Sequence, residues 1–423
     1  MSHKRLNVLL IIEQCNPDWP SVPLEGYRYY QEISQLTDVT LVTHDRNEPA
    51  LEKRQEHQNI VYISESGLIK SYYKWVEKIS AQGRINWPLY NALAFPIYAE
   101  FDRKVYQRFK GPILAGEYDL VHAITPMIPR YPVKLVRFCD RMPLLLGPVN
   151  GGVPFPKGFQ AVARQENAYL NFLRVLGRYL IPGYVQTYRK ASKILAGSTY
   201  TLEMLQNLFS IPDHRIELFY ENGITSDFLT PVIRDHQKGP VHLLFAGRLV
   251  PYKCADVVIE AIGDLIPSVR DRIHLTIVGD GSERPILEQR VKELGIQNRV
   301  HFTGWVNQEQ TVDYYRKADV FCFPSIREFG GAVVLEAMAC GLPCIVANNG
   351  GIGEYVTEKT GFKIEPLSKE YLIQEMTHHI HRLVEDENLR QSMAIQAVDR
   401  AKAFEWSEKA KTIVEIYEKM LST

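Results

Sequence analysis

The sequence predicts two doubly wound α/β domains in tandem. Short apolar segments recur along the chain, each is followed by a stretch in which apolar residues have helical spacing, and the series starts again in the second half. These segments are continuous rather than alternating, which is typical of parallel strands covered on both faces. The length of 423 residues also exceeds what a single hydrophobic core usually supports. We therefore expect two Rossmann-like domains.

The predicted strands form two series, separated by a polar, proline-flanked segment at residues 231–240. The first series comprises residues 7–12, 38–44, 119–124, 143–149 and 193–198. The second series comprises residues 241–248, 274–281, 299–305, 319–325 and 343–351. A single amphipathic helix is predicted at the end of the chain, with Ile413, Ile416, Tyr417 and Met420 on its apolar face. We place the two domains at 1–225 and 226–402 and expect the helix at 403–423 to pack back on the first domain.

Composition and charge exclude several function classes. Lysine plus arginine equals aspartate plus glutamate at 49 each, so no overall field would hold the chain on nucleic acid or on an acidic surface. No apolar run approaches the roughly 20 residues that span a bilayer, and the start of the chain has too short an apolar core for a secretory signal. We expect a cytoplasmic protein with reduced thiols, with peripheral contact at the inner membrane face as the alternative location.

Two cations follow the first strand of the second domain. Arg248 comes directly after the strand, and Lys253 lies five residues later, where the next helix begins. Ligands of α/β sheets bind beyond the carboxyl ends of the strands, and two cations beside the amides of a helix N-terminus suit a diphosphate. The alternative is that both residues are solvated charges at the start of a helix.

Two glutamates lie eight positions apart near the fourth strand of this series. Glu328 falls in the loop after the strand, and Glu336 lies about two turns into the following helix, where its carboxylate can accept hydrogen bonds from a ribose. Gly330 and Gly331 expose the backbone amides at the helix start. A buried helix glutamate and a pair of packing glycines are the alternative interpretation.

Taken together, these motifs resemble the C-terminal domain of glycosyltransferase family 4. The resemblance covers roughly residues 190–423 and rests on GRL…K, IVGDGSE, FTGW, EFGGAVVLEAMACG, NNGGIGE and FEWSEKAKTIVEIYEKM. It implies a GT-B architecture, in which two Rossmann-like domains face each other across a cleft. The first domain would bind the acceptor and the second domain would bind a nucleotide-sugar donor.

The resemblance also implies a role for each matched residue. Arg248 and Lys253 would clamp the donor diphosphate, Glu328 would lie beside the transferred sugar, and Glu336 would bind the ribose. The remaining donor contacts implied in this way are Gly279, Trp305, Val306, Phe329, Gly330, Gly331 and Ala332. The chain has no Asp-x-Asp motif of the kind that holds a catalytic Mg²⁺ in the other main glycosyltransferase fold. We expect neither a metal ion nor a cofactor apart from the nucleotide-sugar co-substrate.

Acceptor contacts are predicted in the first domain. Asn150, Gly151 and Gly152 follow an apolar strand, and a loop there would direct amides toward the acceptor, unless it is a bare turn. At the first strand end, Gly26 and Arg28 stand where many relatives carry paired glycines. A group of cations on predicted acceptor-side loops would suit a phosphorylated acceptor, although scattered surface cations are equally common. Its members are Arg28, Arg130, Lys157 and Arg164.

Two further features have an open interpretation. His122 ends a predicted strand near the place where relatives carry histidines close to the reacting sugar, and it is included among the catalytic candidates with Glu328, Arg248 and Lys253. A buried core histidine is the alternative. Residues 171–193 mix aromatic, apolar and basic side chains, which favours packing against the first sheet over contact with a membrane surface.

The resulting hypothesis is a retaining hexosyltransferase. It would move glucose or a similar sugar from a UDP-sugar to a small sugar or sugar phosphate, such as the fructose 6-phosphate used by sucrose-phosphate synthases of the same family. The alternatives are a polysaccharide or glycolipid glycosyltransferase at the inner membrane face and a GT-B nucleotide-sugar epimerase. An epimerase would release its product without an acceptor.

Overall fold

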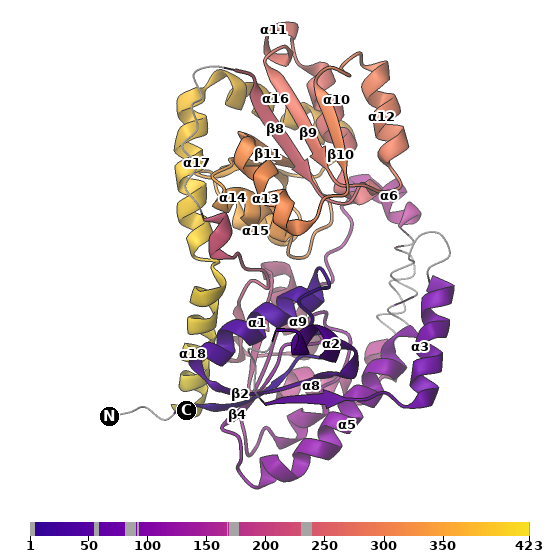
Figure 1. The fold of residues 1–423 in the computed structure, drawn as a ribbon, viewed down its shortest axis with the longest axis vertical. Coiled ribbons are helices and arrows are strands. Elements are labelled where there is room, and N and C mark those ends of the chain that lie inside the picture. The colour runs from indigo at the N-terminus through magenta and orange to yellow at the C-terminus, as the bar shows by residue number, and fades with distance from the viewer. Residues whose placement is uncertain are drawn as a thin grey trace. The chain divides into compact units, whose positions relative to one another are not determined.

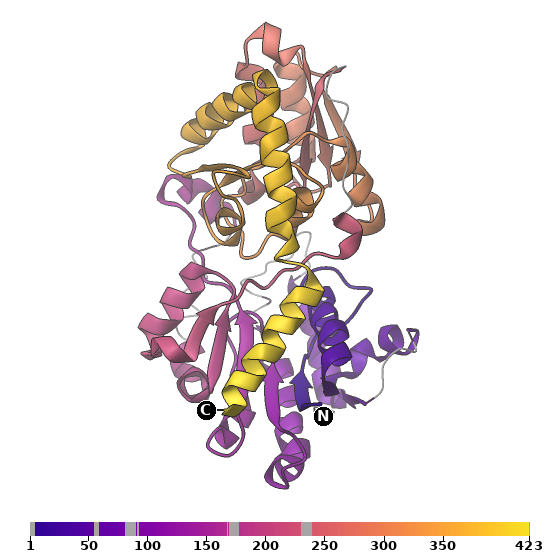
Figure 2. The same cartoon turned by 90° about the vertical axis from the view of Figure 1, so that its left-hand side faces the viewer.

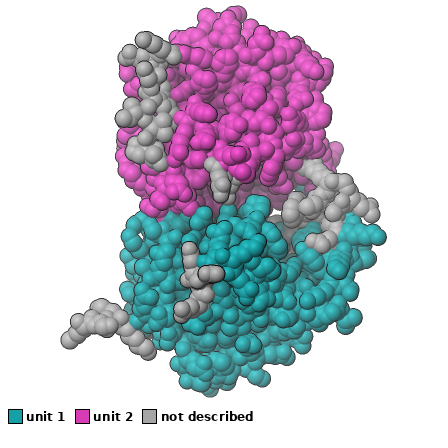
Figure 3. Space-filling view, viewed as in Figure 1, with its two compact units in different colours: residues 1–152, 167–221, 406–423 teal, residues 153–166, 222–405 magenta. Residues whose placement is uncertain are grey.

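The protein is described from a computed structural model, which covers residues 5–54, 59–80, 90, 93–166, 168, 177–229 and 239–422. Two of the expectations above fall partly outside this range, at residues 231–238 of the separating segment and 171–176 of the mixed segment. The chain divides into two compact units, coloured separately in Figure 3. Unit 1 comprises residues 1–152, 167–221 and 406–423, and unit 2 comprises residues 153–166 and 222–405.

Unit 1 is built on a seven-stranded parallel sheet with the order β3-β2-β1-β4-β5-β6-β7 (Figure 1). The strands are β1 (Asn7–Ile11), β2 (Asp38–His44), β3 (Ile60–Ile63), β4 (Leu120–Ala123), β5 (Leu144–Val149), β6 (Lys193–Ala196) and β7 (Ile216–Leu218). Its helices are α1 (Val22–Leu36), α2 (Glu48–Glu52), α3 (Gly67–Ser80), α5 (Phe95–Leu114), α8 (Tyr184–Lys190), α9 (Thr199–Phe209) and α18 (Trp406–Ser422). The sheet is doubly wound, because the strand order reverses at β1 and continues outward on both sides.

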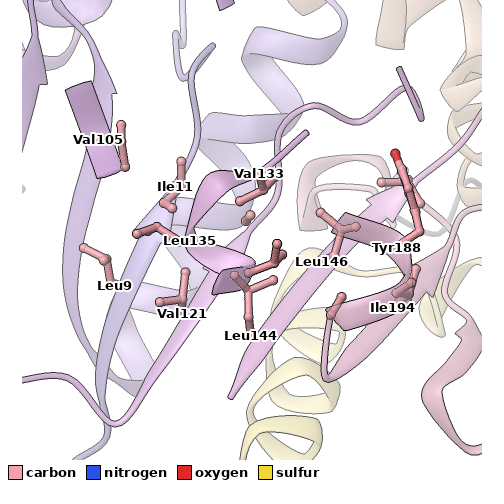
Figure 4. Packing of buried hydrophobic residues seen from close by; sticks show 14 of the residues in the cluster. Leu9, Ile11, Val105, Val121, Val133, Leu135, Leu144, Leu146, Tyr188 and Ile194 are labelled. Atoms are coloured by element: carbon pink, nitrogen blue, oxygen red, sulfur yellow. The ribbon is translucent and has the colours of Figure 1, made fainter. Parts of the chain in front are cut away.

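Successive residues of the central strand β1 enter different cores. Leu9 and Ile11 belong to the cluster shown in Figure 4, together with residues of α5 and α8. Val8 and Leu10 belong to a second cluster formed with α1 and α18. All four side chains are at most 4% exposed, so both faces of the sheet are covered. This explains why the strands are continuously apolar and confirms the prediction of a parallel sheet buried on both faces.

The C-terminal helix α18 packs in unit 1. Ile413, Ile416 and Tyr417 are buried in the second cluster beside α1, and Met420 is partly buried against it. Trp406 meets Tyr29 of α1 edge to face, with 4.9 Å between ring centroids. Figure 2 shows α18, at the yellow end of the colour scale, running beside α1. The apolar face recognised in the sequence is therefore the face that α18 buries.

Unit 2 contains a six-stranded parallel sheet with the order β10-β9-β8-β11-β12-β13. The strands are β8 (Val241–Ala246), β9 (Ile273–Val278), β10 (Val300–Gly304), β11 (Val320–Phe323), β12 (Cys344–Ala347) and β13 (Gly361–Ile364). Its helices are α6 (Gln160–Gln165), α10 (Ala255–Asp264), α11 (Pro267–Arg270), α12 (Arg284–Glu293), α13 (Gln308–Lys317), α14 (Ala332–Ala339), α15 (Gly351–Tyr355), α16 (Lys369–Glu385) and α17 (Glu387–Lys402). The strand order reverses between β8 and β11, which makes this pair the topological switch point.

The chain passes between the two units near the expected boundaries. It also passes between them at one further segment that was not expected. The chain enters unit 2 after Glu221 rather than after residue 225, and it returns to unit 1 at Trp406 rather than at residue 403. Residues 153–166 leave unit 1 and join unit 2, a detour that no sequence pattern indicated. Among the helices that the structure describes, none is both long enough and apolar enough to cross a membrane.

Candidate functional site

The loops after β8 and β11 meet at the switch point of unit 2. These strands are parallel neighbours, so their carboxyl ends lie on the same edge of the sheet. Arg248 is exposed just after β8, and a short 3-10 turn, Pro251–Lys253, leads from there into α10. Glu328 lies in the loop between β11 and α14. Parallel α/β sheets bind their ligands at this kind of position.

An ion pair joins the two loops. Lys253 Nζ contacts Glu328 Oε2, and the two side chains are only 11% and 16% exposed. Ser325 Oγ donates a hydrogen bond to the same carboxylate oxygen at 3.2 Å. The Lys253 ammonium also lies 4.9 Å from the centroid of the Phe323 ring. A largely desolvated charge needs such partners, so the pair fixes the position of both side chains.

Tyr252 connects Arg248 to this ion pair. Its hydroxyl accepts a hydrogen bond from Arg248 Nη2 at 2.8 Å, and the centroid of its ring lies 5.6 Å from Lys253 Nζ. Its carbonyl accepts a hydrogen bond from the amide of Ile326 at 2.9 Å and lies 3.3 Å from Ser325 Oγ, whose single proton is shared between this carbonyl and Glu328. The backbone that carries both cations is thus bonded to the loop that carries Glu328.

Glycine at position 331 allows α14 to begin beside Glu328. Gly331 is the N-cap of α14 with φ of 70°, a conformation that side chains disfavour. A Cβ atom there would lie 2.8 Å from Cγ of Glu328 and 2.3 Å from a methyl carbon of Ile352. The start of α14 therefore lies close to the side chain of Glu328, whose carboxylate also contacts the Lys253 ammonium.

Glu336 is held in the second turn of α14. Its carboxylate accepts a hydrogen bond from the hydroxyl of Tyr315 at 2.9 Å. Tyr315 is fully buried, and burial together with the neighbouring Glu336 charge raises the pKa of its hydroxyl well above the usual value. The phenol therefore stays protonated and acts as a donor, which fixes the orientation of the carboxylate.

The other predicted donor residues lie on loops at the same edge of the unit 2 sheet. Gly279 follows β9, and a Cβ atom there would lie 2.0 Å from the carbonyl oxygen of Gly247, so the loops after β8 and β9 are in close contact. Trp305 follows β10 and is 69% exposed, whereas Val306, Phe329 and Ala332 are partly buried. The structure thus gathers the whole predicted donor set around one sheet edge.

The predicted acceptor residues of unit 1 are largely packed within their own loops. Asn150 is 1% exposed, and its side-chain oxygen accepts hydrogen bonds from Ser198 Oγ at 2.9 Å and Thr201 Oγ1 at 2.8 Å. The Gly151 amide donates to Thr201 Oγ1 at 3.1 Å. Asn150 therefore anchors the loop after β5 to the start of α9. Gly151 and Gly152 continue the same loop.

Two more predicted acceptor residues lie on α1. Gly26 is buried where the helix approaches the end of β1, and a Cβ atom there would lie 2.5 Å from the carbonyl oxygen of Gln14. Glycine is therefore required for close packing at this position. Arg28 is partly buried, and its Nη1 donates to Gln31 Oε1 at 3.1 Å.

The structure divides the predicted group of basic acceptor-side residues. Arg28 and Arg130 belong to unit 1, whereas Lys157 and Arg164 belong to unit 2 and are exposed on residues 153–166. The four basic residues therefore do not all belong to one unit, although they were predicted as one group.

His122 is a buried residue of β4 with both ring nitrogens engaged. Nε2 lies 2.7 Å from the Gly147 carbonyl oxygen, and Nδ1 lies 2.6 Å from the hydroxyl of Tyr417 on α18. Because a carbonyl only accepts, Nε2 carries the proton and Nδ1 accepts from the tyrosine. Burial lowers the pKa of His122 to about 4. This environment is that of a core histidine, the alternative noted from the sequence.

We expect His122 to make unit 1 sensitive to acid. Above pH 6.5 the ring is neutral in both the folded and unfolded states. As the pH falls from 6.5 to 4, the unfolded chain binds a proton that the native ring does not, so the free energy of unfolding drops by on the order of 3 kcal/mol. In His122→Gln this part of the pH dependence should vanish when unfolding is followed between pH 4 and 7. The exposed His214 of the same unit is the control, and His214→Gln should retain the dependence.

Three residues of the site were not singled out in the sequence. Tyr252 and Ser325 join the loops, and Tyr315 orients Glu336. Tyr252 and Ser325 lie next to motifs that were recognised in the sequence, so their positions could have indicated that they belong to the site. Tyr315 lies on α13, and only the packing of that helix against α14 brings it to Glu336.

Parts of the chain are similar to known proteins. Residues 231–400 match the family model of glycosyl transferases group 1, which confirms the resemblance indicated by the motifs of the second domain. A D-inositol 3-phosphate glycosyltransferase of Streptosporangium roseum is 28% identical over 289 residues, or 63% of this chain. The chain spans less than two thirds of the length of the first such relatives, 64% in this case.

Solved structures match nearly the whole chain. Anabaena Alr3699/HepE in complex with UDP superposes with a TM-score of 0.63 at 18% identity, covering 98% of this chain and all of that one. The sucrose-phosphate synthase of Thermosynechococcus elongatus superposes with a TM-score of 0.62 at 19% identity, covering 99% and 100%. These matches confirm the predicted GT-B fold.

Proposed function

We propose that this chain, a GT-B protein whose residues 231–400 are similar to group 1 glycosyl transferases, is a retaining glycosyltransferase that uses a nucleoside-diphosphate sugar. The sugar, glucose or a close analogue, would pass to a hydroxyl group of the acceptor. The observation that carries the proposal is the arrangement of Arg248, Lys253 and Glu328 at the switch point of unit 2.

This arrangement suits the departure of a nucleoside diphosphate. Negative charge grows on the leaving diphosphate as the glycosidic bond breaks, and fixed positive groups stabilise it most when they need no reorganisation. Lys253 is already held by Glu328, and Arg248 by Tyr252. With the amides at the start of α14, these cations supply the charge that a metal ion supplies elsewhere. We therefore propose a metal-independent reaction.

Glu328 would orient the donor sugar rather than attack it. Retaining hydrolases use two carboxylates about 5 Å apart, one of them as a nucleophile. Here one oxygen of Glu328 contacts both Lys253 and Ser325, and Glu336 is held by Tyr315 and assigned to the ribose. Attack of the acceptor on the donor face that the diphosphate leaves retains the configuration without a protein nucleophile.

UDP-glucose is the proposed donor. Alr3699/HepE has been solved in complexes with UDP and with UDP-glucose. The exposed Trp305 and the partly buried Val306, after β10, would face the base, and Glu336 would hold the ribose. An exposed aromatic ring can stack on a base, and a fixed carboxylate can accept hydrogen bonds from ribose hydroxyls.

A phosphorylated sugar or polyol is the proposed acceptor. Two similar proteins, a D-inositol 3-phosphate glycosyltransferase and a sucrose-phosphate synthase, bear names that specify phosphorylated compounds. Fructose 6-phosphate is the first acceptor to test. The exposed cations Lys157 and Arg164 would attract its phosphate.

A glycolipid or polysaccharide acceptor at a membrane surface is the second candidate. Leu68 and Trp75 of α3 are 85% and 49% exposed, and Lys70, Lys74 and Lys78 recur along the same helix. Interfacial helices combine exposed apolar and basic residues in this way. Pelleting with anionic vesicles, and its loss in Trp75→Ser, would favour this candidate over a soluble acceptor.

The test begins with the donor. Thermal unfolding is measured with UDP-, ADP- and GDP-glucose, and UDP-glucose should raise Tm most, because ligand binding to the native state stabilises it. Release of UDP is then followed with and without fructose 6-phosphate, in buffer containing EDTA. We expect acceptor-dependent release that EDTA does not abolish. Release of a free sugar product without any acceptor would instead indicate an epimerase, and the absence of any donor effect would overturn the proposal.

A further inference from the structure

Residues 153–166, here called the strap, pack on the donor-site loops of unit 2. The strap follows directly on Gly152, at the end of the loop that Asn150 anchors in unit 1. Its helix α6 contacts the 3-10 turn that carries Lys253, and both line a partly open cavity of about 280 Å³ together with Leu287 and Lys369. A Cβ atom at Gly158 would lie 1.9 Å from the carbonyl oxygen of Leu367, so the strap is packed closely there as well.

The first residues of the strap contact the loop that carries Glu328. The Arg327 guanidinium contacts two aromatic rings, with its Cζ 4.8 Å from the centroid of Phe155 and 5.3 Å from that of Phe329. Its Nε donates to the carbonyl oxygen of Val153 at 3.4 Å. Arg327, the residue immediately before Glu328, thus contacts two residues of the strap.

Asn349 and Gly350 form a second connection between the strap and the loop that carries Glu328. Asn349 Nδ2 donates to the carbonyl oxygen of Ile326 at 2.6 Å and to that of Pro154 at 3.3 Å. The next residue, Gly350, forms a β-bridge with Glu328, and a Cβ atom there would lie 1.9 Å from the Glu328 carbonyl oxygen. Asn349 therefore bonds both to the strap and to the loop that carries Glu328, and the neighbouring Gly350 pairs with Glu328 itself.

We infer that Arg327 is a positioning residue for the transfer reaction, held in place by Phe155 of the strap. It would act by fixing the backbone from which Glu328 reaches Lys253 and the donor sugar. Both partners of this contact belong to unit 2, and the strap follows the loop after β5 along the chain. The inference rests on the proposed glycosyltransferase function.

The test compares two arginine–aromatic contacts of unit 2. Arg327→Met and Phe155→Leu each remove the site contact while keeping apolar bulk. Arg382→Met and Phe362→Leu remove a similar contact, in which Cζ lies 5.2 Å from the ring centroid, between α16 and β13. For the full-length enzyme we measure kcat, KM for UDP-glucose, the affinity for UDP alone and the thermal unfolding temperature.

A displaced Glu328 should slow the chemical step, whereas Arg248 and Lys253 should still bind the diphosphate. We expect kcat to fall on the order of 10- to 100-fold in Arg327→Met and in Phe155→Leu, with UDP affinity unchanged. The double variant should be no slower than the worse single variant, because both changes break one contact. Phe155→Tyr, which keeps an aromatic face, should restore kcat, and the control pair should leave kcat unaltered.

The possible outcomes separate the two proposals. If the wild-type protein releases no UDP in an acceptor-dependent manner, the proposed function fails and the positioning role fails with it. If the wild type is active and Arg327→Met retains full kcat, the positioning role alone is overturned. Equal losses of kcat and Tm in the site pair and the control pair would show that the contact serves stability only, which also overturns it.

Discussion

Replacing Arg248 by alanine is expected to lower kcat/KM for UDP-glucose by on the order of 10²- to 10³-fold. The loss corresponds to one fixed positive donor removed from the charge that develops on the leaving diphosphate. The fold should be unaffected, because Arg248 is exposed and its hydrogen bond to Tyr252 lies at the surface. Changes at such positions usually alter the free energy of unfolding by less than about 0.5 kcal/mol. Steady-state kinetics with a thermal melt of the same preparation measure both quantities.

Arg272→Ala is the matched control for this prediction. Arg272 is also exposed in unit 2 and is paired with Glu385 at 2.6 Å, on residues outside the donor loops. Its loss should leave kcat/KM unchanged. Glu328→Gln is the companion change, since the amide oxygen can still accept from Lys253 and Ser325 while the charge is lost. It should abolish transfer without unfolding the protein. Full activity in Arg248→Ala or in Glu328→Gln would refute the site assignment.

Replacing Lys409 by alanine is expected to destabilise unit 1 by about 3 kcal/mol or more. Lys409 of α18 is 5% exposed; its ammonium donates to the Tyr220 carbonyl oxygen and lies 4.0 Å from the centroid of the Phe219 ring. Burial lowers the pKa of Lys409, and the nearby carboxylates of Glu221 and Glu25 offset only part of this decrease. Removing the ammonium would leave those two carboxylates without this cation. Chemical denaturation of unit 1, followed by the fluorescence of Trp406, measures the change.

Lys411, two residues along the same helix, serves as the comparison. Its side chain is 57% exposed and pairs with Glu408 at 2.6 Å. Exposed pairs contribute roughly 0–1 kcal/mol, so Lys411→Ala should have little effect on unfolding. If both variants lose the same stability, the buried position of the Lys409 charge would not account for the result. Because Tyr220 and Glu221 precede the passage of the chain into unit 2, Lys409 also fixes the point of departure from unit 1.

The donor site was more predictable than the acceptor site for a physical reason. Arg248, Lys253, Glu328 and Gly331 all lie between a parallel strand and the helix that follows it, and the ends of neighbouring parallel strands meet at one sheet edge. Spacing along the sequence therefore translates into proximity. The contact between Lys253 and Glu328, 75 residues apart, confirms that translation.

Burial decides the role of a residue in ways that a motif does not reveal. Asn150 was predicted to face an acceptor, yet its side chain bonds to Ser198 and Thr201 and is almost fully enclosed. His122 shares its strand-end position with functional histidines of relatives, but Tyr417 from the far end of the chain occupies its second nitrogen. Both partners are distant in sequence, so only the packed fold could identify them.

The sequence by itself determined the two doubly wound sheets, the apolar face of the last helix and the charged residues of the donor loops. Each of these follows from local patterns, namely continuous apolar strands, helical spacing and residues placed at strand ends. The tertiary structure alone decided that residues 153–166 pack on unit 2 and that Phe155 and Arg327 meet. Such contacts depend on which surfaces of separate segments are complementary, and that complementarity has no periodicity along the chain.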